Sequence, residues 1–210
     1  MMATACAMLV AILYLVVAGI FFFDPVQKTR NAHQYMQVLT QAPYCRYGIH
    51  AVRALTGLAG LALISPARQA AGSGFWIDWA SLLGVLGFGS MVVSHSRALF
   101  CLPVLIREYQ AVEQAVKPAV ARQLSLVLLD PRGWVEIGGV AVWALVVTLA
   151  ARDRLDVHSS VVAIAVAFAV LSVVNVFAWV SQRYSLVSVT TGAALMILAP
   201  SWFIWLGTTM

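Results

Sequence analysis

The topology of this chain depends on the stretch YGIHAVRALTGLAGLALIS, residues 47–65. Arg53 interrupts this stretch, and the uninterrupted apolar part at residues 54–64 is too short to cross a bilayer alone. If residues 47–65 cross completely, every later segment lies on the opposite side from the one it would occupy after a hairpin return. The rest of the sequence decides between these two arrangements.

The composition of the whole chain indicates a membrane protein. Of its 210 residues, 62% are hydrophobic and 10% are charged, and the mean hydropathy is +0.90. A soluble globular protein carries about 25% charged residues, so this chain has too few to cover a surface that faces water. The formal net charge is +5, but Lys and Arg are scattered between apolar stretches, which argues against a nucleic-acid partner. Cys6, Cys45 and Cys101 lie far apart and predict neither a disulfide framework nor a zinc site.

Six stretches are candidates for transmembrane helices. The hydrocarbon core of a bilayer is about 30 Å thick and takes about 20 apolar residues as a helix. The sequence therefore predicts an all-α integral membrane protein, a single polytopic domain over residues 1–210 built as a six-helix transmembrane bundle. The expected spans are residues 5–23, 47–65, 75–94, 134–151, 159–180 and 184–206.

Positive charge favours a complete crossing at residues 47–65. With six spans, ten of the 13 Lys and Arg residues fall on one side of the membrane or at its edge, and Arg68, Arg152 and Arg154 fall on the other. With a hairpin return, the division is seven against six. Cytoplasmic loops are normally enriched in Lys and Arg. We therefore expect six spans in a bacterial inner membrane, with both chain ends outside the cytoplasm.

The segments expected on the cytoplasmic side contain further helices. Asp24-Pro25 and Asp130-Pro131 each follow an apolar stretch and are typical of helix starts, with Asp as N-cap and Pro at the first helical position. The first pair is expected to open a short polar helix over residues 26–41. Within residues 98–129, apolar residues recur at helical spacing opposite charged ones. This pattern predicts an amphipathic helix in the plane of the cytoplasmic interface or, alternatively, a helix that docks a partner.

Five polar residues fall in the cytoplasmic half of this arrangement and are the candidates for a ligand site. They are His50, Arg53, His95, Glu136 and Asn175. A charged side chain costs about 2.5–3.5 kcal/mol at the centre of a membrane helix, which makes such residues functional candidates. One interpretation is a pocket between helices that binds a headgroup, quinone, porphyrin or proton. The structural alternative, which we favour, is that Arg53 reaches the membrane edge or pairs with Glu136, while Asn175 hydrogen-bonds a neighbouring helix.

Haem needs a separate test on the same residues. Bis-histidine ligation requires two imidazoles at matching depth on facing helices, and His50 with His95 is the only eligible pair. Gly84, Gly87 and Gly89 would admit the face of a ring. The position of His95 at or beyond the membrane edge argues against this ligation.

The sequence contains no clear catalytic or metal-binding template. Ser94-His95-Ser96 has no acid nearby in the sequence, and there is neither an HExxH motif nor a phosphate-binding loop. An intramembrane enzyme would need His50 or His95 aligned with Glu136 and a nucleophile or metal.

We therefore predict a non-enzymatic integral membrane protein, an accessory or structural subunit whose partners are membrane lipids and other membrane chains. The alternative is a binder or transporter of a small molecule (lipid, quinone, pigment or haem) that uses the polar residues of the cytoplasmic half. The sequence leaves the identity of any cofactor open.

Overall fold

The computed structural model describes residues 2–29, 31–128, 133–152, 154–181 and 184–210. Within these residues every regular element is a helix, which confirms the all-α prediction. The long helices are α1 (Met2–Phe23), α3 (Tyr44–Ala71), α4 (Phe75–Ala111), α6 (Gly133–Ala151), α7 (Ser159–Val180) and the series α8 (Tyr184–Ala193), η2 (Ala194–Leu198) and α9 (Ala199–Thr209). The short helices are η1 (Pro25–Lys28), α2 (Ala32–Gln41) and α5 (Lys117–Leu128).

Five helices are long and apolar enough to cross a membrane, as expected of a multi-pass membrane protein. The stretch at residues 47–65 lies within α3, which continues past Arg53 without interruption. The expected span at residues 134–151 corresponds to α6, whose apolar part, Val135–Ala151, is shorter than the other five. By length and composition, the described residues therefore provide five spans and one shorter apolar helix.

The last of these spans is a continuous helix with one π-helical turn, η2. The Ala199 N–H donates to the Ala194 carbonyl, five residues earlier in the chain. Pro200 follows directly, and proline has no N–H to donate to the preceding turn. The wider π turn lies where the regular hydrogen-bond ladder has to accommodate this missing donor.

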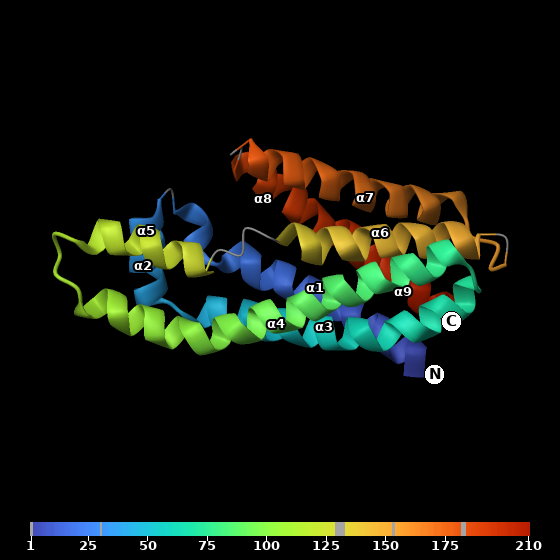
Figure 1. Ribbon diagram of the computed structural model, residues 1–210, viewed down its shortest axis with the longest axis horizontal. Coiled ribbons are helices and arrows are strands. Elements are labelled where there is room, and N and C mark those ends of the chain that lie inside the picture. Colours follow the sequence, from blue (N-terminus) through green and yellow to red (C-terminus); the bar gives the residue numbers. More distant parts are fainter. Residues whose placement is uncertain (1, 30, 129–132, 153, 182–183) are drawn as a thin grey trace.

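The long helices form a closed up-and-down bundle. Each packs against the next long helix in the chain, and α9 returns to α1. Figure 1 shows consecutive long helices running in opposite directions, with the N and C ends at one end of the bundle and α2 and α5 at the other. We call the end with α2 and α5 the head end, and the other the terminal end.

Aromatic side chains fill the middle of the bundle. Phe88, Trp143, Trp202 and Phe203 are each fully buried. The ring centroids of Trp143 lie 5.7 Å from Phe88 and 5.3 Å from Trp202, both in edge-to-face contacts. The indole N–H of Trp202 donates to the Thr148 hydroxyl at 2.7 Å, which joins α9 to α6. Packed rings, rather than an open channel, therefore occupy this part of the interior.

Glycines allow α3 and α4 to approach closely. A Cβ atom at Gly57 would lie 2.7 Å from the Phe88 carbonyl oxygen, and one at Gly60 would collide with the Phe88 ring. Gly57 and Gly60 share a helical face with His50 and Arg53. The small residues therefore bring the polar face of α3 against α4.

The helix expected over residues 98–129 does not form as one element. Residues 98–111 continue α4, which does not end at residue 94, and α5 begins only at Lys117. Residue 129 lies outside the described residues. Because residues 75–111 form one helix, residues 98–111 cannot lie in the membrane plane while the rest of α4 crosses it.

The apolar stripe in this region is buried against protein. Leu102 and Tyr109 of α4 pack with Met36 and Leu39 of α2 and with Ala121 of α5. We call these three segments (α2, residues 102–111 of α4, and α5) the head. Protein and lipid accept the same apolar stripe, so helical spacing could not distinguish between them.

The first Asp-Pro pair starts a helix, but a shorter one than expected. The Asp24 carboxylate accepts a hydrogen bond from the Val26 N–H at 3.0 Å, and Pro25 occupies the first position of η1. The chain then restarts at α2, where the Asn31 side chain caps the Gln34 N–H. The expected helix over residues 26–41 is thus two helices, each with its own cap. The second pair, Asp130-Pro131, lies outside the described residues.

Candidate functional site

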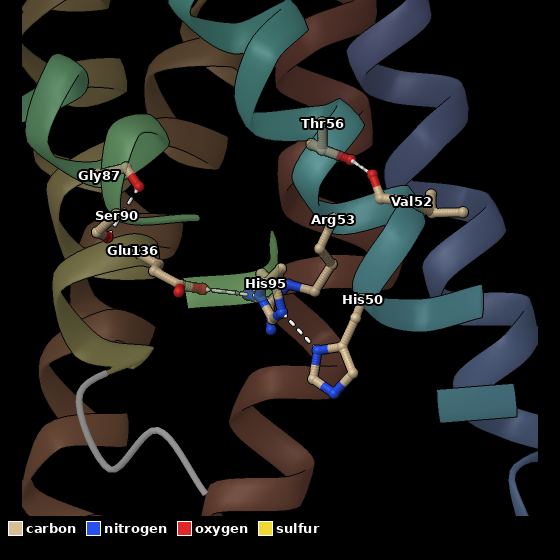
Figure 2. Close-up of polar contacts among 8 residues, drawn as sticks. All are labelled: His50, Val52, Arg53, Thr56, Gly87, Ser90, His95 and Glu136. Carbon is tan, nitrogen blue, oxygen red and sulfur yellow. Dashed lines mark hydrogen bonds and ion pairs between the residues drawn. The ribbon is translucent and has the colours of Figure 1, made fainter. Parts of the chain in front are cut away.

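Four of the five predicted polar residues come together between three helices. His50 and Arg53 lie on α3, His95 on α4 and Glu136 on α6. The spacing of three residues between His50 and Arg53 places both on one face of α3. Figure 2 shows these side chains in one group, with His95 between Glu136 and His50.

The four residues form a continuous series of polar contacts. The Arg53 Nη2 donates to Glu136 Oε2 at 2.9 Å, and His95 Nε2 lies 3.3 Å from the same oxygen. The other ring nitrogen of His95, Nδ1, lies 2.7 Å from Nδ1 of His50. We call this series, Arg53–Glu136–His95–His50, the polar chain.

The contact between the two histidines restricts where protons can be. Two nitrogens can share a hydrogen bond only if one carries the proton and the other offers a lone pair. A carboxylate only accepts, so His95 must carry a proton on Nε2 to bond Glu136. His95 is therefore either neutral and accepts the Nδ1 proton of His50, or doubly protonated and donates its own.

The polar chain is buried within the bundle. Glu136 is 1% exposed, His95 7% and His50 8%, and the Arg53 side chain is 17% exposed. A buried charge is tolerated only when it is paired and hydrogen-bonded. Arg53 and His95 provide the pairing and the hydrogen bonds for the Glu136 carboxylate. The Ser94 side chain lies near this carboxyl group, but Glu136 Oε1 has no hydrogen bond of normal geometry within the described residues.

The hydroxyl groups of Thr56 and Ser90 do not extend the polar chain. Thr56 donates to the Val52 carbonyl at 2.8 Å and Ser90 to the Gly87 carbonyl at 3.1 Å, each within its own helix (Figure 2). These contacts satisfy the hydroxyl protons locally. Towards the middle of the bundle, the next side chains in the interior are the aromatic rings of Phe88 and Trp143.

Asn175 does not join this group. It lies on α7, and its Nδ2 donates to the hydroxyls of Thr190 and Thr191 on α8, both at 2.8 Å. Asn175 therefore hydrogen-bonds a neighbouring helix, and Arg53 pairs with Glu136. Both contacts are those of the structural alternative.

The arrangement does not fit haem ligation by His50 and His95. Two imidazoles on opposite faces of a haem iron need their ligating nitrogens about 4 Å apart, from two metal–nitrogen bonds of about 2 Å each. The Nδ1 atoms of His50 and His95 are only 2.7 Å apart and share a hydrogen bond. No group of three or more metal-binding side chains occurs among the described residues either.

Two surface hollows in the described part of the chain lie elsewhere. One is in the head, beside His33 and Pro118, and the other is at the terminal end, beside Arg68 and Gly72. Neither is lined by the polar chain, so its residues do not converge on either of these hollows.

Two groups near these residues were not singled out from the sequence as site candidates. Tyr14 on α1 is buried and close enough to Arg53 and Glu136 to be affected by their charges. Tyr14 is the one tyrosine in the apolar stretch at residues 5–23, and this was the signal that the sequence offered. At the head end of the bundle, Arg46 Nε contacts Asp24 Oδ2 at 2.8 Å, and the Arg46 guanidinium lies 5.5 Å from the Tyr35 ring centroid. These three residues have no regular spacing in the sequence.

Burial affects the ionisation of Tyr35, which lies outside the long helices. Burial raises the pKa of its phenol above the usual value of 10.0, because the anion would lose solvation, although the positive charge of Arg46 acts in the opposite direction.

Comparison with protein-family models, with curated proteins and with solved structures finds no match to this chain.

Proposed function

We propose that this chain is a non-enzymatic integral membrane protein, an accessory or structural subunit that packs against other membrane chains. The observation that carries the proposal is the closed interior. Rings such as Trp143 and Trp202 fill the middle of the bundle, and the polar chain makes its contacts internally. An interior of this kind favours a packing role over a role in which a substrate passes through the bundle.

We further propose that the bundle has six spans, with α6 as the sixth. The apolar part of α6, Val135–Ala151, rises about 25 Å at 1.5 Å per residue, slightly less than a hydrocarbon core of about 30 Å. α6 packs between α4 and α7, and its Val140 and Ala144 are fully buried. A central helix shielded by longer neighbours can cross the bilayer with a shorter apolar length.

The positive charges support a cytoplasmic head. Arg97 and Arg107 of α4 lie towards the head, whereas Arg68 and Arg154 lie at the terminal end, and the sequence count of Lys and Arg favours the head side. By the positive-inside rule, both chain ends then lie outside the cytoplasm, in a bacterial inner membrane. A reporter active only in the cytoplasm, fused after Met210, should be inactive. The same reporter inserted at residue 114, in the turn after α4, should be active, and the reverse pattern would contradict the topology.

Two open glycines support packing against another membrane chain. A Cβ atom at Gly89 of α4 or Gly138 of α6 would meet nothing within 4 Å, so neither glycine is required by the bundle itself. Glycine in a helix interior costs about 1 kcal/mol relative to alanine, and small residues on a lipid-facing surface let a second helix approach closely.

Native purification tests this role. Extraction in a mild detergent followed by mass spectrometry should recover additional membrane chains with this one. The variants Gly89→Leu and Gly138→Leu should lose them, whereas Gly19→Leu, at an open glycine of α1, should keep them. A chain that migrates alone in several detergents, and unchanged by these substitutions, would contradict the proposal.

A second candidate function is binding or transport of a small molecule, such as a lipid, quinone or pigment. Its support is the polar chain, because ionisable side chains at this depth are costly unless they have a role. The His50–His95 contact weighs against haem. Extraction of bound molecules from the wild type and from Arg53→Leu would separate the two functions: a molecule lost only from Arg53→Leu supports this candidate, and identical extracts argue against it.

A further inference from the structure

The polar chain has two different ends. His50 lies within the first two turns of α3, which begins at the head, and it is the end of the series farthest from Glu136 (Figure 2). The other end is the Arg53 guanidinium, which stays protonated at all accessible pH values. A proton can therefore be exchanged at the His50 end, while the Arg53 end neither releases nor accepts one.

We propose that the polar chain is a one-ended proton-binding site, which takes up a single proton from the head side through His50 and holds it on His95 beside Glu136. This goes beyond the proposed packing role and does not depend on it. The proposal rests on the contacts at 2.7 Å between the two Nδ1 atoms and at 3.3 Å between His95 and Glu136.

The uptake is a transfer along one hydrogen bond. In the starting state His50 carries its proton on Nδ1, donated to Nδ1 of neutral His95, and His95 donates its Nε2 proton to Glu136. A proton from water bonds to Nε2 of His50, the nitrogen that does not face His95. The Nδ1 proton of His50 then moves to Nδ1 of His95. One proton has entered, one N–H bond has been added in total, and the positive charge is on His95 next to the carboxylate.

The surrounding charges limit the site to one proton. A second proton would leave two positive rings facing each other through Nδ1 atoms that could no longer share a hydrogen bond. Burial opposes positive charge on His50 most strongly, Arg46 and Arg53 on α3 also oppose it, and Glu136 on α6 favours it. Tyr14 on α1 is a further titratable group close to the chain.

The apolar interior makes this a site rather than a pathway. Beyond Glu136, Thr56 and Ser90 bond to carbonyls of their own helices, and the rings of Phe88 and Trp143 follow. Neither Thr56 nor Ser90 continues the series towards the terminal end. The proton therefore leaves by the way it entered.

Nitrogen NMR of the full chain in lipid vesicles tests the proposal without any substitution. The sequence contains four histidines, so isotope-labelled histidine gives a small set of signals, assigned with His33→Gln and His158→Gln. We expect coupling between two Nδ1 nuclei across a hydrogen bond, and, in a titration run from about pH 4 to 9, uptake of one proton by that pair. Absence of the coupling, uptake of two protons by the pair, or no uptake would overturn the proposal.

Two further measurements test the role of Glu136, which stabilises the bound proton, and the absence of a proton pathway towards the terminal end. Glu136→Gln should lower the proton affinity of the pair about tenfold or more, because the carboxylate that stabilises the positive ring is lost. Asp78→Asn, at the exposed terminal end, should leave the affinity unchanged. Vesicles containing the wild type should hold a pH gradient as long as vesicles without protein. An unchanged affinity in Glu136→Gln, or rapid collapse of the gradient, would contradict a one-ended site.

Discussion

Two arginine–carboxylate pairs at opposite ends of the bundle have similar geometry but different surroundings. Arg53 Nη2 and Glu136 Oε2 are 2.9 Å apart, with side chains 17% and 2% exposed. Arg68 Nε and Asp78 Oδ1 are closer, at 2.6 Å, but their side chains are 52% and 51% exposed. Exposed pairs contribute about 0–1 kcal/mol because water screens them, whereas breaking a buried pair leaves an uncompensated charge. The comparison indicates that burial, rather than distance, decides what each contact contributes.

The largest expected effect comes from breaking the buried pair. Glu136→Ala should lower the free energy of unfolding by about 3–5 kcal/mol, because Arg53 and His95 lose their shared acceptor. Reversible denaturation in detergent micelles measures this change. The double variant Arg53→Met with Glu136→Leu should recover much of the loss, since it removes both charges. A loss below about 1 kcal/mol in Glu136→Ala would show that the pair is already solvated.

A smaller loss is expected at the third pair, Asp24–Arg46, between the end of α1 and the start of α3. Asp24 is 2% exposed and also caps the Val26 N–H. Asp24→Ala should cost about 2 kcal/mol, because the cap is lost while Arg46, partly exposed, can turn to water. Hydrogen exchange in η1 and the first turn of α3 should rise. Asp24→Asn retains the cap and should recover about half of the loss; equal losses in both variants would assign the effect to charge alone.

Asn175 provides a buried contact without charge. Asn175→Leu should cost about 1 kcal/mol, a typical value for a hydrogen bond between membrane helices. The loss is small because Thr190 keeps its own hydrogen bond to the Leu186 carbonyl at 2.8 Å. Thermal unfolding followed by circular dichroism checks this value. A loss as large as that of Glu136→Ala would mean that polarity in the bundle, and not charge, sets the energy scale.

The smallest effect is expected at the terminal end. Arg68→Ala should change the free energy of unfolding by less than about 1 kcal/mol, and the change should become smaller in about 1 M salt, because salt screens charges that are exposed to solvent. The Glu136→Ala loss should persist in the same salt. If both losses respond equally to salt, burial is not what separates the two pairs.

The sequence predicted the positions of most long helices, but it predicted only some of the contacts between them. It placed His50, Arg53, His95 and Glu136 near one end of the bundle, because each position within a span gives a depth in the membrane. It also favoured a hydrogen bond from Asn175 to a neighbouring helix, but it could not identify that helix as α8. Depth follows from position in the chain, but the direction in which a side chain points follows from the rotation of each helix.

In the head, too, the sequence predicted a feature of the helix but not what that helix contacts. Residues 98–129 have an amphipathic pattern, and that part of the analysis agrees with the buried Leu102 and Tyr109. The expected partner was lipid and the observed partner is α2. The continuation of α4 beyond residue 94 was also unexpected. This continuation includes Pro103, and proline in a helix interior costs about 3 kcal/mol, which packing has to offset.

Composition and helical periodicity were sufficient to establish an all-helical, multi-pass membrane protein. Both depend only on residues that are close together in the sequence, so they are the same however the helices pack. The polar chain and the head were fixed only when the helices packed together. Their contacts join residues 41, 45 and 83 positions apart, so they depend on how each helix is rotated and how deeply it is set against the next. Gly57 and Gly60 fix part of that setting by letting α3 approach Phe88, and the meeting of His50 with His95 follows from it.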